Sequence, residues 1–309
     1  PDIELHPTSS VINNENPCKP GGGHIDTMRP SALISATELR SLLATQNDVL
    51  VVDCRYALTD ASAGAEAYAN GHIPGAHYAD LGTLLSGPVT GMTGRHPLPD
   101  PQAFADGMAA MGANNDTLIV AYDADDAMFA ARLWWLLRWI GHQNVRVLDG
   151  GLKTWLEAGG DLNTRAPSAQ RGTLALRTRD MPTVTFTDML ENVESRKRVM
   201  VDARSPDRYR GENETIDPIG GRIPGALNRF YKENVDAGGR FKPAEELRAA
   251  FHELLGDTPP EQVIHQCGSG VSACHNLLAM EIAGLGGGTL YPGSWSEWCR
   301  QRDVPVERG

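Results

Sequence analysis

The sequence contains no apolar run near the roughly 20 residues that a membrane-spanning helix needs. Its first residues show no basic segment followed by an apolar one, so no secretory signal is apparent. Basic residues are outnumbered, 28 Lys and Arg against 39 Asp and Glu, which gives a formal net charge of −11. This balance argues against a general binder of nucleic acid or of anionic membranes. An anionic substrate would need a local cationic site.

Cysteine is also scarce. The five residues are odd in number and scattered: Cys18, Cys54, Cys267, Cys274 and Cys299. This pattern fits reduced thiols in a cytoplasmic protein better than a disulfide framework. Cys267 and Cys274 have no second His/Cys cluster at metal spacing beside them, so we expect neither a metal nor another cofactor.

An internal repeat divides the chain. The length of 309 residues already suggests two domains, and three phrases recur in the same order. They are Asp53-Cys54-Arg55 and Asp202-Ala203-Arg204, Gly71-His72-Ile73-Pro74-Gly75-Ala76 and Gly221-Arg222-Ile223-Pro224-Gly225-Ala226, and the glycine-to-tryptophan stretches 150–155 and 293–298. A self-match of this extent predicts two copies of one fold.

The copies and their boundaries follow from composition. Residues 1–30 are rich in Pro, Gly and Asn and predict a poorly ordered arm. The first copy spans 31–160, an unmatched linker spans 161–182, and the second copy spans 183–309. Within each copy short β-branched strands alternate with helical patterns, which predicts an α/β domain whose mainly parallel sheet is flanked by helices. The helix at 129–140 is too apolar for one face and should be largely buried, its Trp pair included.

Cys267 follows a predicted strand at 263–266 and precedes a predicted helix at 273–283. Backbone N–H groups and the helix N-terminus converge at such a turn and stabilise an anion, so a thiolate at Cys267 should be favoured. Gly268 and Gly270 let the loop aim its N–H groups inward. The alternative is a buried, inert cysteine at a strand end.

The repeat provides an internal control for this interpretation. The position equivalent to Cys267 in the first copy is Asp123, followed by Ala124, Asp125 and Asp126. A carboxylate therefore takes the place of the sulfur nucleophile. We expect the first copy to be chemically silent and the second to be active.

These residues resemble the tandem rhodanese family of sulfurtransferases over about residues 31–309. The phrases that carry the resemblance are Asp-x-Arg at 53–55 and 202–204, the Gly-x-Ile-Pro-Gly-Ala pair, Cys-Gly-Ser-Gly-Val-Ser at 267–272, and Tyr-Pro-Gly-Ser-Trp-Ser-Glu-Trp at 291–298. The neutral cysteine loop is most similar to 3-mercaptopyruvate sulfurtransferases, whereas thiosulfate sulfurtransferases more often carry basic residues after the cysteine. Thiosulfate is a dianion and gains more from such cations.

The resemblance implies a mechanism. Cys267 takes sulfur from a small donor as a persulfide, and a thiol such as reduced thioredoxin, or cyanide, removes it. The backbone of the loop would hold the persulfide through Gly268, Ser269, Gly270, Val271 and Ser272. We expect a monomer.

Further roles carry over by position. Arg208 matches the arginine that binds the donor carboxylate. A second arginine of the family is replaced by Asp217, and Arg222 or Arg210 are the candidates for the missing charge.

Ser269 matches a serine that works with a histidine and an aspartate of the first domain. His72 matches that histidine, and Asp60 is the candidate aspartate. Before Ile-Pro-Gly, His72 could equally be a structural capping group.

Three other functions compete with this reaction. A dual-specificity phosphatase needs an arginine at the end of the loop, where this chain has Ala273. A non-catalytic sulfur-relay or binding module would not need the intact cysteine loop. Thiosulfate sulfurtransferase activity with the same residues is the closest alternative to the mercaptopyruvate reaction.

Overall fold

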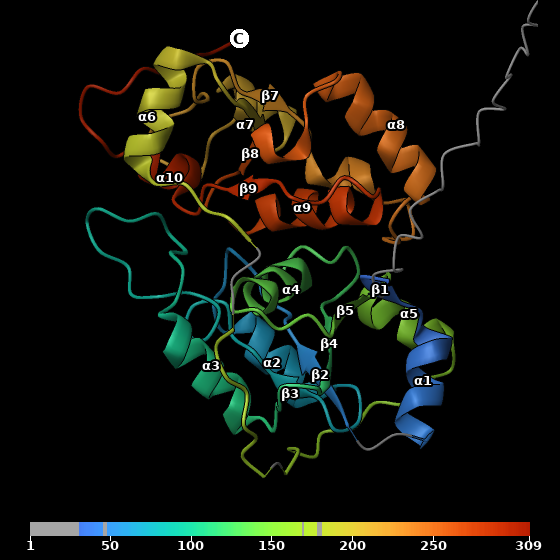
Figure 1. Cartoon of the computed structure of the whole chain (residues 1–309). Coiled ribbons are helices and arrows are strands. Elements are labelled where there is room, and N and C mark those ends of the chain that lie inside the picture. Colours follow the sequence, from blue (N-terminus) through green and yellow to red (C-terminus); the bar gives the residue numbers. More distant parts are fainter. Residues whose placement is uncertain (1–30, 46–47, 169, 178–180) are drawn as a thin grey trace, which may run out of the picture. The chain divides into compact units, whose positions relative to one another are not determined.

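The computed structural model of the protein describes residues 31–45, 48–168, 170–177 and 181–309. The arm predicted for residues 1–30 lies outside the described residues, as does part of the predicted linker. Residues 31–309 belong to a single compact unit, and this unit contains two sheets (Figure 1).

The first sheet has five strands in the order β1-β5-β4-β2-β3, and each strand pair is parallel. Its strands are β1 Leu33–Ile34, β2 Val49–Asp53, β3 His77–Tyr78, β4 Leu118–Tyr122 and β5 Val145–Leu148. The accompanying helices are α1 Ala36–Thr45, α2 Ala63–Asn70, α3 Pro101–Ala110, α4 Ala130–Trp139 and α5 Gly151–Glu157.

The second sheet has four strands in the order β7-β6-β8-β9, again with parallel pairs. Its strands are β6 Val199–Asp202, β7 Leu227–Asn228, β8 Val263–Gln266 and β9 Thr289–Leu290. The helices are α6 Phe186–Ser195, α7 Pro206–Arg210, α8 Ala244–Leu255, α9 Ser272–Ile282 and α10 Ser294–Trp298, with 3₁₀ turns at Tyr231–Asn234 and Pro260–Gln262. The predicted pair of α/β domains with parallel sheets is thus present.

The repeated sequence motifs make the same contacts in both domains. At the end of β2, Arg55 pairs with Asp53 at 2.6 Å and donates to the carbonyl of Gly71 at 2.7 Å. At the end of β6, Arg204 pairs with Asp202 at 2.6 Å and donates to the carbonyl of Gly221 at 2.8 Å. Each guanidinium therefore ties a strand end to the Gly-x-Ile-Pro-Gly-Ala turn that follows, and bidentate geometry makes such pairs specific.

Helices α4 and α9 pack against each other between the two sheets (Figure 1). Every residue of α4 is buried, Trp134 and Trp135 included, as the apolar sequence predicted. The N-terminal ends of both helices follow the loops after β4 and β8. This packing places the Asp123 and Cys267 loops of the two domains near the contact between them.

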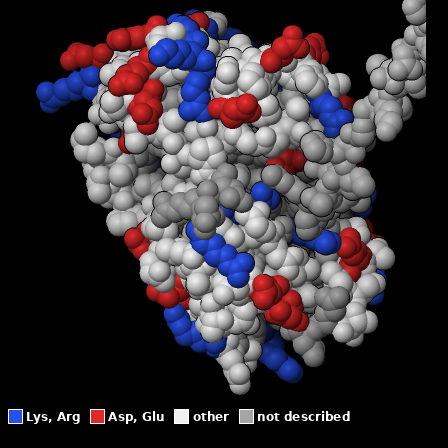
Figure 2. Space-filling model, viewed as in Figure 1, with Lys and Arg blue, Asp and Glu red and all other residues white. Residues whose placement is uncertain are grey.

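The surface carries charges of both signs. Figure 2 shows Lys and Arg interspersed with Asp and Glu on one face of the molecule. Within the described ranges, none of the helices has the length and hydropathy required to span a membrane.

Candidate active site

The sulfur of Cys267 lies in a turn of backbone amides. The loop runs from the end of β8 to the start of α9, and the N–H of Gly270 donates to Cys267 Sγ at 3.1 Å. Gly270 has φ +77°, the left-handed conformation that glycine adopts at little cost and that turns this N–H toward the sulfur. An anionic sulfur is stabilised by such a donor at the N-terminus of an 11-residue helix.

The glycine-tryptophan stretch at 293–298 anchors the cysteine loop from behind. The N–H of Trp295 donates to the carbonyl of Cys267 at 3.0 Å, and the N–H of Ser296 donates to that of Gly268 at 2.9 Å. Ser294 Oγ accepts the N–H of Cys267 at 3.1 Å. The loop is therefore held at both of its first two residues, which fixes the position of the sulfur.

Gly268 serves a different purpose from Gly270. A Cβ atom at this position would lie 3.0 Å from Arg95 Nη2 and 3.6 Å from Arg208 Nη1. The missing side chain thus lets two guanidinium groups, one from each domain, approach the residue next to Cys267.

Cys267 faces a cavity of about 210 Å³ that both domains line. The residue is only 2% exposed, so the cavity is the route by which a small molecule reaches the sulfur. The lining residues are Leu58, Arg95 and Met128 from the first domain and Ala203, Arg204, Ser205, Arg208, Phe230, Tyr231, Cys267, Gly268, Ser269, Val271 and Ser272 from the second.

Three arginines at the cavity are matched by three carboxylates. Arg204 pairs with Asp202 at 2.6 Å and lies 3.6 Å from Glu214. Arg208 lies 3.0 Å from Glu214 and 3.3 Å from Asp217, and Arg95 also pairs with Asp217. The formal charges of this network cancel. Burial raises the pKa of Asp217, and the nearby Arg95 opposes the increase.

Ser269 is joined to a histidine of the first domain. His96 Nδ1 lies 2.8 Å from Ser269 Oγ, and the two residues are 173 positions apart. Burial lowers the pKa of His96 to about 3, and the positive charges of Arg132 and Arg95 act in the same direction. The imidazole is therefore neutral near pH 7 and can take part in hydrogen bonds as donor and acceptor.

The expected pairing of Ser269 with His72 is corrected by the structure. His72 stacks on Tyr68 with ring centroids 4.0 Å apart, and its nitrogens contact the carbonyls of Tyr68 at 2.8 Å and Arg165 at 3.1 Å. His72 is thus a structural group near the end of α2, as the alternative interpretation had it.

The sequence prediction does not include His96, because this residue lies outside the repeated motifs. A signal was present in the repeat, since Gly94-Arg95-His96 is followed later by Gly239-Arg240-Phe241, and only the first copy has the histidine. Gly94 itself contacts the second domain so closely that a Cβ would lie 2.4 Å from the carbonyl oxygen of Gly293.

Asp60 is likewise away from the sulfur. Its carboxylate is exposed and accepts hydrogen bonds from Ser62 N at 2.9 Å and Ser62 Oγ at 2.8 Å. These bonds hold the residue that directly precedes α2. The expectation that Asp60 completes a triad with Ser269 is therefore corrected.

The two candidates for the missing charge are engaged elsewhere. Arg222 binds Glu307 at 2.5 Å and lies over the ring of Tyr209, and Arg210 pairs with Glu212 at 2.8 Å on the surface. Neither lines the cavity. Arg95, supplied by the other domain, stands beside Arg208 instead.

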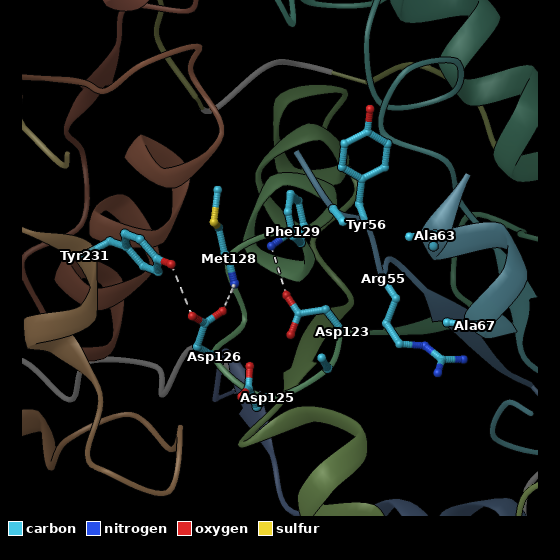
Figure 3. A pocket seen from close by; sticks show the side chains of 13 residues that line it. Arg55, Tyr56, Ala63, Ala67, Asp123, Asp125, Asp126, Met128, Phe129 and Tyr231 are labelled. Atoms are coloured by element: carbon cyan, nitrogen blue, oxygen red, sulfur yellow. Dashed lines mark hydrogen bonds between the residues drawn. The ribbon is translucent and has the colours of Figure 1, made fainter. Parts of the chain in front are cut away.

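The equivalent loop of the first domain is filled by its own carboxylate, as the sequence predicted. Asp123 Oδ1 accepts the N–H of Ala127 at 3.0 Å, while Oδ2 accepts those of Phe129 at 2.9 Å and Ala130 at 3.2 Å (Figure 3). Burial and the nearby Asp126 raise the pKa of Asp123 to about 7, although these N–H groups oppose the shift.

A second cavity of about 340 Å³ lies at this first-domain loop. Met128 and Tyr231 line both this cavity and the one at Cys267, and the Tyr231 hydroxyl donates to Asp126 at 3.1 Å (Figure 3). The two cavities are therefore neighbours that share part of their lining.

Two α/β domains of one design, with a cysteine loop in one and a carboxylate loop in the other, define a protein built from tandem copies of one domain. The chain belongs to the family of the rhodanese-like domain, whose family model matches residues 35–158 and 185–301. The predicted family and fold class are confirmed.

Individual relatives are similar over nearly the whole chain. A probable 3-mercaptopyruvate sulfurtransferase of Pseudomonas aeruginosa is 43% identical over 284 residues, covering 91% of this chain and 100% of that protein. A putative thiosulfate sulfurtransferase, SseB of Mycobacterium tuberculosis, is 35% identical and covers 91% of this chain and 98% of its own.

Among solved structures, the 3-mercaptopyruvate sulfotransferase SseA of Escherichia coli has a TM-score of 0.74 and 32% identity, covering 87% of this chain and 100% of that one. The prediction that the protein is a sulfurtransferase is confirmed by these relatives. A sulfur donor and a sulfur acceptor are thus its substrates.

Proposed function

We propose that the protein moves sulfur from 3-mercaptopyruvate to a thiol or cyanide acceptor through a persulfide on Cys267. The observation that carries this proposal is the N–H of Gly270, 3.1 Å from Cys267 Sγ, at the wall of a cavity large enough for a three-carbon acid. The three arginines at the cavity are balanced by three carboxylates, so the site has no excess positive charge. Such a site supports a donor with one negative charge over a donor with two.

The first half-reaction exchanges one bond for another. The Cys267 thiolate attacks the thiol sulfur of the donor, an S–S bond forms, and the C–S bond breaks. The electron pair of that bond goes to carbon as the enolate of pyruvate, which takes up a proton. With Nδ1 protonated, His96 donates to Ser269 Oγ, and the serine hydroxyl is free to donate to the developing enolate oxygen.

The donor carboxylate would be held by the guanidinium groups next to Gly268. Arg208 comes from α7 and Arg95 from the first domain, and both line the cavity. Arg204 also lines it, and its buried Nη1 has no hydrogen-bond partner among the described residues. These guanidinium groups supply local N–H donors for a carboxylate, although their formal charges are balanced by Asp202, Glu214 and Asp217.

In the second half-reaction the acceptor thiolate attacks the outer sulfur of the persulfide and restores the Cys267 thiolate. A thiol such as reduced thioredoxin is the proposed acceptor. A cytoplasmic location and a monomeric state belong to the same proposal. The four described cysteines are free thiols, the state that a reducing compartment maintains.

A comparison of donors tests the proposal. We expect kcat/KM for 3-mercaptopyruvate to exceed that for thiosulfate by at least about tenfold, because the carboxylate and carbonyl match the arginines and the Ser269 hydroxyl, a difference of about 1.4 kcal/mol. Thiocyanate production from cyanide measures thiosulfate turnover, and pyruvate release measures mercaptopyruvate turnover.

Thiosulfate is the second candidate donor, favoured by the three guanidinium groups at the cavity and by the name of the Mycobacterium tuberculosis relative. If thiosulfate proves the better donor, the argument from loop charge is wrong while the cysteine chemistry stands. If neither donor adds one sulfur atom to Cys267, as read by mass spectrometry, the chain is a binding or relay module.

Asp217 should oppose the binding of anionic donors. Because its pKa is raised, mainly by burial, it gains a proton as the pH falls and then releases Arg95 and Arg208. We therefore expect pyruvate to bind Cys267→Ser protein more tightly as the pH is lowered from about 8, by roughly the 3- to 10-fold of a typical net hydrogen bond.

Asp217→Asn should bind pyruvate tightly across that range, with little change with pH. Calorimetric titration measures both effects. Glu212→Gln is the matched control, since Glu212 pairs with the surface residue Arg210. A pH dependence that survives in Asp217→Asn would contradict this role.

A further inference from the structure

Arg132 is a buried cation of the first domain directly behind the Cys267 loop. It belongs to α4 and is 0% exposed. Its guanidinium spans two segments, since Nη1 donates to the carbonyl of Gly270 at 3.1 Å, and Nη2 donates to those of His96 at 3.2 Å and Pro97 at 3.4 Å. Nε and Nη2 also donate to the carbonyl of Leu85, both at 3.3 Å.

These partners are all neutral. Among the residues that the structure describes, no carboxylate pairs with Arg132, whereas Arg95, Arg204 and Arg208 each have at least one. A buried charge without a counter-charge is costly, and carbonyl dipoles repay only part of the cost. Arginine does not escape by losing its proton. Arg132 therefore favours any state of its surroundings that carries a negative charge.

Cys267 and Cys274 are the groups near Arg132 that can become anions. Burial raises the pKa of Cys274 to about 12, and its Sγ donates to the carbonyl of Gly270 at 3.3 Å. Cys274 therefore stays a thiol near neutral pH. Cys267, whose sulfur is held by the N–H of the same Gly270, is left as the counter-charge.

The first-domain loop shows what happens without a nucleophile. Asp126 follows Asp123 by three residues, just as Gly270 follows Cys267 by three. The carbonyl of Asp126 also contacts a side-chain nitrogen from the helix of the other domain. That group is His275 Nε2 of α9, at 2.9 Å. Burial lowers the pKa of His275 to about 3, so this group is neutral. The helix of each domain thus contacts the other domain's loop, and the permanent charge faces the loop that contains sulfur.

We propose that Arg132 is a positioning residue by which the silent domain favours the anionic forms of Cys267, the thiolate and the persulfide, and holds His96 against Ser269. It touches no substrate. Its charge acts through the Gly270 peptide and across the buried space to the sulfur, while its contacts with the His96 and Pro97 carbonyls fix the segment that carries the imidazole. The persulfide part rests on the proposed function, but the thiolate part does not.

The decisive measurement is the rate of Cys267 alkylation by iodoacetamide as a function of pH, because only the thiolate reacts. Arg132→Met removes the charge at similar length, and Arg132→Lys keeps it. The midpoint of the profile should move up by about one pH unit or more in Arg132→Met, with a rate about tenfold lower near neutrality, and by less in Arg132→Lys.

Arg138→Met is the matched control. Arg138 lies in the same helix and is also largely buried, but it pairs with Glu281 at 3.4 Å. It should leave the profile where it is in the wild type. A wild-type profile in folded Arg132→Met, or an equal displacement in Arg138→Met, would overturn the proposal.

The other titratable and charged groups around the sulfur are the same in the wild type and in the Arg132 and Arg138 variants. Their titration therefore does not contribute to a difference between the alkylation profiles. They are His96, His265, Cys274, Tyr231, Glu297, Arg95, Arg204 and Arg208 with their partners Asp202, Glu214 and Asp217.

A second measurement needs no change at Arg132, in case Arg132→Met does not fold. If Cys267 is the counter-charge of Arg132, the melting temperature of Cys267→Ser should fall further below that of the wild type as the pH rises, because serine cannot supply the thiolate. Parallel curves would count against Arg132 as the partner of a thiolate.

The alkylation test separates this inference from the proposed function. If wild-type protein takes sulfur from neither donor but Arg132→Met still moves the profile, the proposed donor chemistry fails and the role of Arg132 stands. If sulfur transfer is rapid and the alkylation profile does not change in Arg132→Met, the proposed donor chemistry stands and the role of Arg132 fails.

Discussion

Cys267→Ala protein should lose sulfur transfer from either donor by at least about 10⁴-fold, as enzymes do when their nucleophile is removed. Cys267 is the cysteine at the wall of the cavity, and the N–H of Gly270 is directed at its sulfur. The intact mass after incubation with the donor should not increase, whereas the wild type should gain one sulfur atom.

Cys54→Ala is the control for this change. Cys54 is also buried, at 1% exposure, but it lies in the first domain directly after β2. We expect this variant to transfer sulfur at close to the wild-type rate and to form the persulfide. Persulfide on Cys267→Ala, located by peptide mapping to another cysteine, would show that the loop has been assigned the wrong role.

Arg208→Gln should weaken donor binding by about 1.5–3 kcal/mol, the usual value of a hydrogen bond to a charged group, which is roughly 10- to 150-fold in KM. The reason is its place at the cavity beside Gly268. The maximal rate should change less than KM, because the guanidinium holds the carboxylate and not the reacting sulfur. Initial rates over a range of donor concentrations separate the two constants.

Arg210→Gln provides the comparison, since Arg210 is two residues further on and pairs with Glu212 at the surface. Its KM should match that of the wild type. An equal loss in both variants would mean that the effect comes from the general field of the domain. A loss of maximal rate alone in Arg208→Gln would place the arginine nearer to the chemistry than we propose.

The repeat made the fold accessible from sequence. Strand β8 Val263–Gln266 has the predicted bounds, because the buried strand ends at a glycine-rich loop. Helix α6 begins with a capping box formed by Thr185 and Asp188. The same local pattern of strand, loop and helix predicts Cys267 as the nucleophile, and its sulfur accepts the N–H of Gly270 at 3.1 Å.

The partners of Cys267 were less accessible. His96 and Arg95 come from an irregular loop of the first domain, and their contacts with Ser269 and Asp217 join residues more than 100 positions apart. The hydrophobic periodicity of a sequence reflects residues that are close together along the chain, and it does not predict contacts between distant loops. Asp217 is visible in the sequence as the replacement of an arginine, but its pairing with Arg95, 122 positions away, is not.

A polypeptide of residues 183–309 would contain the sulfur atom but not His96, Arg95 or Arg132, which contact or approach Ser269, Gly268 and Gly270 of its loop from the other half. The first copy, which has Asp123 where the second has Cys267, thus provides part of the surroundings of the second copy's loop, and this dependence is a reason for the two copies to remain in one chain.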